Sequence, residues 1–179
     1  MKTIILSKEK ILRLIGIIIM LIGIIIAFCS KEIELIDTTI LDGNAGTTPI
    51  GITLHVIVIL AFTLVSAILL YIANRMDSTC SLSQKKNLIF HILYVAIGLF
   101  FSIASGCSER SHHLSEYYNN IHSKPSWYMQ DIINMRGFNN IPKAADTLSN
   151  IATVFYILTV IGIIALALFY FKTLEEKQN

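Results

Sequence analysis

Charged residues are scarce in this chain: 15% of its 179 residues are charged, against about 25% in a typical soluble domain. Hydrophobic residues make up 54% of it. This balance excludes an intrinsically disordered protein, which has low hydrophobicity and high charge, and it argues against an ordinary soluble enzyme. The formal net charge of +2 is too small to indicate nucleic-acid binding, so we expect no nucleic-acid partner.

The motifs of common catalytic sites are also missing. The sequence contains no P-loop, no Gly-rich dinucleotide turn and no pair of carboxylates inside an apolar run. Its three cysteines are Cys29, Cys80 and Cys107, and none of them forms the C-x-x-C pair of a thiol–disulfide enzyme. The sequence therefore favours a protein that is not an enzyme, and we predict no catalytic residue.

Four apolar runs are present, each long enough to cross a bilayer as a helix of about 20 residues. They cover about residues 11–29, 49–73, 87–106 and 151–171. Their hydrophobicity is continuous and does not alternate, which indicates helices and not barrel strands. The sequence predicts an all-α membrane protein, in which four transmembrane helices form a bundle and residues 1–179 make one integral membrane domain.

Basic residues are unevenly distributed among the segments that connect the four runs. With the N-terminus in the cytoplasm, residues 1–13, 74–86 and 172–179 lie on one side of the membrane. These segments hold nine of the 14 Lys and Arg residues, whereas the other side holds eight of the 12 Asp and Glu residues. The positive-inside rule therefore predicts that both the N- and C-termini are cytoplasmic.

The first run has a competing interpretation as a cleaved signal peptide. Lys2 to Arg13 would be its basic region and Leu14 to Phe28 its apolar region. Cleavage near Ser30 would leave three spans. The mass of the mature chain distinguishes the two interpretations.

Small and polar residues lie on the faces through which helices associate in lipid. Those that we single out are His55, Ser66, His91, Gly98, Ser102 and Gly106. Two interpretations remain open for them. They form helix-packing contacts, or they line a path for a substrate.

The polar segment of about residues 107–150 separates the third and fourth runs. We expect a helix from Ser108 to about Ile121, capped by Ser108, and a second short helix over residues 126–135 on the outer membrane surface. Lys143 is expected to begin a helix that continues into the fourth run. Together these elements predict a small helical extracytoplasmic cap, which could also bind a partner or ligand.

Two further sites are suggested by this side of the protein. His112, His113 and His122, with Glu116, offer ligands for a metal ion such as zinc or copper, although the residues favour a solvated polar helix over a metal site. Cys29 ends the first span and Cys107 follows the third, both at the outer face, so they could form a disulfide in an oxidising compartment.

The sequence favours one function over two alternatives. The favoured one is a non-enzymatic accessory or interaction subunit of a membrane complex, in contact with the lipid bilayer and with other membrane subunits or further copies of itself. The alternatives are a small oligomeric transporter or channel, and an outer-face metal-binding protein, for which a metal ion is the only cofactor expected. The high Ile and Asn content suggests a bacterial protein of the cytoplasmic (inner) membrane.

Overall fold

The structure, a computed structural model, describes residues 7–29, 50–77, 83–123 and 138–178; the side chains of residues 27–29, 50–55 and 173–178 lie outside this description. The described residues are helical and contain no strand. The elements are α1 (Lys8–Cys29), α3 (Ile50–Met76), α4 (Gln84–His122), the 3-10 turn η1 (Phe138–Asn140) and α6 (Ile141–Gln178). The prediction of an all-helical protein is confirmed.

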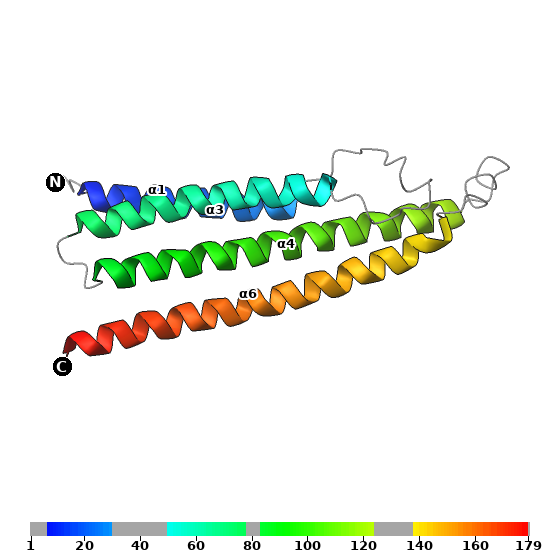
Figure 1. Ribbon diagram of the computed structural model, residues 1–179. Coiled ribbons are helices and arrows are strands. Elements are labelled where there is room, and N and C mark those ends of the chain that lie inside the picture. The colour runs from blue at the N-terminus through cyan, green and yellow to red at the C-terminus, as the bar shows by residue number, and fades with distance from the viewer. Residues whose placement is uncertain (1–6, 30–49, 78–82, 124–137, 179) are drawn as a thin grey trace, which may run out of the picture.

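The helices pack against one another in the order of the chain. α1 packs along α3, α3 packs along α4, and α4 packs along α6 (Figure 1). The start of α1 and the end of α6 lie at one end of the molecule, together with the end of α3 and the start of α4 (Figure 1). We call this the terminal end. At the opposite end, α4 and α6 extend beyond α3 as an antiparallel pair.

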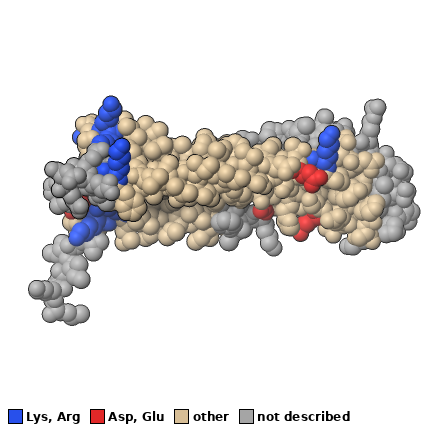
Figure 2. Space-filling view, turned by 90° about the horizontal axis from the view of Figure 1, so that it is seen from below, with Lys and Arg blue, Asp and Glu red and all other residues tan. Residues whose placement is uncertain are grey.

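Three helices are long and apolar enough to cross a membrane within the part of the chain that the structure describes. The segments are Val56–Met76 of α3, Gln84–His122 of α4 and Phe138–Lys172. Their length and composition indicate an integral membrane protein. Helix α1, whose side chains are described up to Ile26, is not among them, and charged residues at positions 8, 9, 10 and 13 lie in its first two turns. Figure 2 shows the wide band of uncharged surface between the charged ends of the molecule.

Helix α4 is longer than the sequence suggested. We expected a new helix to begin at Ser108, but Ser108 lies inside α4, which runs without a break through 39 residues. The helix begins instead after Ser83, whose hydroxyl accepts a hydrogen bond from the Lys86 amide at 3.4 Å. No proline occurs between Ser83 and Pro125, and packing against α6 keeps the helix continuous through Gly106.

The length of α4 has a direct consequence for its position in a bilayer. At a rise of 1.5 Å per residue its 39 residues measure about 58 Å, whereas a bilayer with its headgroups is about 40–45 Å thick. Its uncharged stretch, residues 87–108, measures about 33 Å and matches the hydrocarbon core. With this stretch in the hydrocarbon core, the residues after it would extend beyond the core.

The projecting part is a packed structure, which we call the hairpin tip: residues 107–123 of α4 with residues 138–152 of η1 and α6. Its interior is a cluster of buried apolar residues, namely Cys107, Leu114, Ile121, Phe138, Ile141, Ala145, Leu148 and Ala152. The Tyr118 ring stacks on Phe138, with the ring centroids 4.9 Å apart. The Ser111 hydroxyl also donates to the Ala145 carbonyl at 2.8 Å. The predicted helix start at Lys143 falls at Ile141, and the helix expected over residues 126–135 lies outside the described residues.

Candidate functional site

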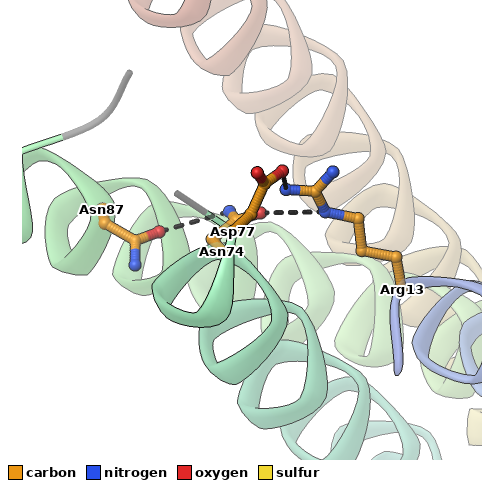
Figure 3. Close-up of polar contacts among 4 residues, drawn as sticks. All are labelled: Arg13, Asn74, Asp77 and Asn87. Atoms are coloured by element: carbon orange, nitrogen blue, oxygen red, sulfur yellow. Dashed lines mark hydrogen bonds and ion pairs between the residues drawn. The ribbon is translucent and has the colours of Figure 1, made fainter. Parts of the chain in front are cut away.

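A polar cluster joins three helices at the terminal end. The Arg13 guanidinium on α1 forms an ion pair with Asp77, the residue directly after α3, with Nη2 and Oδ2 2.7 Å apart (Figure 3). Its Nε donates to the Asn74 side-chain oxygen at 3.2 Å. The Asn74 amide in turn donates to the side-chain oxygen of Asn87 on α4 at 3.3 Å (Figure 3). One guanidinium and two amides therefore connect α1, α3 and α4.

His91 lies one turn further along α4 from Asn87 and is 5% exposed. Its Nδ1 is 2.7 Å from the Asn87 carbonyl oxygen. Because a carbonyl oxygen only accepts, Nδ1 carries the proton in this hydrogen bond. The imidazole also contacts the rings of Tyr71 and Phe90 edge-on, with centroids 5.5 and 5.3 Å away. His91 thus acts as a packed element between α3 and α4.

Helices α3 and α4 approach each other most closely, among the glycine positions, at Gly98 in the middle of their contact. A methyl group added there would overlap with the Thr63 side chain, so only glycine allows this approach. Thr63 is fully buried, and its hydroxyl donates to the Ile59 carbonyl at 2.9 Å within the same helix. Close contact through small residues is how helices associate in lipid, where the hydrophobic effect gives no attraction between them.

Ser66 and Ser102, two of the residues considered for a substrate path, are fully buried. The Ser66 hydroxyl lies 3.0 Å from the Tyr94 hydroxyl across the α3–α4 contact. The Ser102 hydroxyl donates to the Leu99 carbonyl at 2.8 Å. Both hydroxyls thus have partners inside the protein, as residues of a packing contact do. The side chain of His55 lies outside the described residues.

The histidines of the hairpin tip do not converge. His112 pairs with Glu116, with Nε2 and Oε1 3.3 Å apart, and His113 pairs with Glu109 at 3.1 Å. The ring of His122 stacks instead on Tyr118, with the centroids 5.6 Å apart. Among the residues that the structure describes, no group of three His, Cys, Asp or Glu side chains could hold a metal ion.

Cys107 and Gly106 lie in the interior of the molecule, where α4 packs along α6. Both are buried, and Cys107 belongs to the apolar cluster between α4 and α6. The side chain of Cys29 lies outside the described residues. The disulfide between them therefore stays a prediction.

Of the polar cluster and its neighbour His91, only His91 was singled out from the sequence as a candidate residue. The sequence did contain a sign of the ion pair. Arg13 lies near the start of the first apolar run and Asp77 follows the second, so two opposite charges are expected at the same membrane boundary. The contribution of the two asparagines depends on the rotation of each helix about its axis, which one sequence does not reveal.

Comparison with known proteins adds no assignment to this geometry. The chain matches no family model, and neither a curated protein nor a solved structure is significantly similar to it.

Proposed function

We propose that this chain is a four-span protein of the bacterial cytoplasmic membrane that acts as a non-enzymatic accessory subunit. It associates with other membrane subunits, or with further copies of itself, through the hairpin tip. The observation that carries the proposal is the continuation of α4 and α6 beyond the start of α3 as a packed pair of helices (Figure 1). A chain whose only task was to span the membrane would not need this structured projection.

The small-residue contacts inside the membrane are already occupied by the chain itself. Gly98 faces Thr63, Gly23 on α1 faces Phe62, and a methyl group at Gly162 on α6 would lie 2.7 Å from Ile97. These glycines therefore hold the four helices together and leave no glycine contact for another subunit among those positions. We therefore place the proposed interaction surface on the hairpin tip and not on these glycine contacts.

The surface of the hairpin tip has the polar character expected of a water-exposed docking face. Its exposed side chains on α4 are Ser108, His112, Glu116, Asn119, Asn120 and His122, and on α6 they are Lys143, Asp146, Thr147, Ser149 and Asn150. Both signs of charge occur among them, and the polar amides can donate and accept hydrogen bonds. Interfaces between separately folded proteins commonly have such polar rims.

The proposal includes a specific membrane arrangement. With both ends of the chain in the cytoplasm, the hairpin tip faces the outer side, and α1 forms the fourth span beside α3. The charged first turns of α1 then lie at the headgroup level, where Arg13 is held by Asp77.

Site-specific photo-crosslinking in cells tests the proposed interaction. A photoreactive amino acid at Asn120, exposed on the hairpin tip, should give one discrete protein–protein adduct. The matched control carries it at Ile161, which is 55% exposed on α6 at membrane depth and should contact lipid. The proposal would be contradicted by protein adducts at position 161 but not at position 120. It would also be contradicted if neither position gave an adduct and the protein were a solitary monomer in mild detergent.

A further inference from the structure

Exposed cations from all four helices gather at the terminal end. They are Lys8 and Lys10 on α1, Arg75 on α3, Lys85 on α4 and Lys172 on α6. Figure 2 shows Lys and Arg concentrated at one end of the molecule.

Acidic residues offset only part of this charge. The acids at the terminal end whose side chains the structure describes are Glu9 and Asp77, and the Arg13 guanidinium already holds Asp77 at 2.7 Å. The last two turns of α6 add Glu175, Glu176 and Lys177 to the charges at this end. The charge of the hairpin tip is more balanced, because the exposed acids Glu116 and Asp146 accompany exposed Lys143 there. The terminal end therefore has a positive surface that the other end lacks.

Each exposed cation also lies beside exposed apolar surface on its own helix. Residues three or four positions apart share a helix face. Lys85 precedes Leu88, which is 50% exposed, and Lys172 follows Leu168, which is 64% exposed. The same spacing relates Arg75 to Ile72 on α3, and Ile72 is 41% exposed.

This repeated pairing fits one kind of ligand. A phospholipid presents a negatively charged headgroup directly above acyl chains, and a long basic side chain can reach the headgroup while its neighbours contact the chains. Clusters of four to eight Lys or Arg residues next to spanning helices attract anionic lipids. A soluble acidic protein would match the cations but would not cover the apolar residues beside them.

We infer that the terminal end binds the headgroups of anionic phospholipids, with the cation and apolar pairs on α3, α4 and α6 as individual contact points. The inference uses only the membrane-spanning character of the chain, so it stands apart from the proposed role of the hairpin tip.

The test reconstitutes the full chain into phosphatidylcholine vesicles that contain a small fraction of spin-labelled lipid. The fraction of motionally restricted label is compared between phosphatidylglycerol and phosphatidylcholine probes. We expect wild type to prefer phosphatidylglycerol. The triple variant Arg75→Gln, Lys85→Gln, Lys172→Gln should lower that preference about two- to five-fold, and salt should weaken what remains.

Two variants that each remove one positive charge distinguish a local lipid contact from an effect of the overall charge of the protein. Lys85→Gln should lower the preference, whereas Lys143→Gln, exposed at the hairpin tip, should leave it unchanged. Both side chains are exposed, so an unchanged helical circular dichroism spectrum is expected for each. Equal association of the two lipids with wild type, or equal effects of Lys85→Gln and Lys143→Gln, would overturn the inference.

Discussion

The Arg13 guanidinium lies 2.7 Å from the Asp77 carboxylate, across 64 positions of sequence, and fastens α1 to the end of α3. The Arg13 side chain is 35% exposed and that of Asp77 15% exposed. A second donor of the same guanidinium bonds Asn74. This fork-shaped contact is one that the single ammonium of a lysine cannot reproduce.

Removal of this contact should weaken the attachment of α1. We expect Arg13→Ala to lower the free energy of unfolding by about 1 kcal/mol, a modest value because a third of the Arg13 side chain remains in solvent. Thermal unfolding in detergent measures the loss. In a double-mutant cycle with Asp77→Ala, the combined loss should be smaller than the sum of the two single losses. Strict additivity would show that the ion pair has no coupling energy.

Gly98→Ala should be the most damaging glycine substitution inside the membrane. The new methyl group would overlap with the buried Thr63 side chain, and overpacking of this kind costs about 1–3 kcal/mol. The control is Gly16→Ala, where the methyl group would lie 3.2 Å from the Cγ of Leu70, a flexible side chain. Thr63→Ala should restore part of the thermal stability lost in Gly98→Ala. Equal melting temperatures for the two glycine variants would contradict the close approach of α3 and α4.

Phe138→Ala should unfold the hairpin tip without disturbing the membrane part. Phe138 is 2% exposed and stacks on Tyr118, and truncation of a buried phenylalanine costs about 3–5 kcal/mol. Hydrogen exchange followed by mass spectrometry should show faster exchange in residues 109–122 and unchanged exchange in α3. The neighbouring exposed residue supplies the control, since Asn139→Ala should change neither region. Uniformly faster exchange in Phe138→Ala would show that the tip is not a separate unit.

Helix α1 should remain part of the mature protein. It packs along α3, with Gly23 against Phe62 and Arg13 against Asp77, so its removal would expose buried groups of α3. The intact mass of the purified protein measures this directly. We expect a mass that includes residues 8–29. A chain that begins near Ser30 would instead support the signal-peptide interpretation of the first apolar run.

The apolar runs predicted where helices lie but not how far they extend. Residues 87–106 were recognised as a span because bilayer thickness sets a length that is visible in hydropathy. The sequence predicts a helix from Ser108 to about Ile121 but not its continuity with the third span, because Ser108 is interpreted as a cap and capping residues also occur inside helices. In this case tertiary packing decided the outcome, since Leu114 and Ile121 face α6 in the interior of the hairpin tip.

Contacts between helices were the least predictable from the sequence. Gly98 was placed on a packing face, yet nothing in the sequence identified Thr63 as its neighbour. The terminal cluster shows the same limit, because Asn74 and Asn87 gain their roles only from the relative rotation of α3 and α4. Periodicity fixes which residues share a face of one helix, whereas the partner of that face depends on the packing of the whole chain.

The hairpin tip and the terminal end should lie on opposite sides of one membrane. The most direct measurement is labelling of Asn119→Cys and Lys85→Cys in intact cells with a membrane-impermeant maleimide, after replacement of the native cysteines by alanine. Both positions are exposed. We predict that Asn119→Cys reacts at once and that Lys85→Cys reacts only after the cells are permeabilised. Reaction of both positions in intact cells, or protection of position 119 alone, would contradict the account.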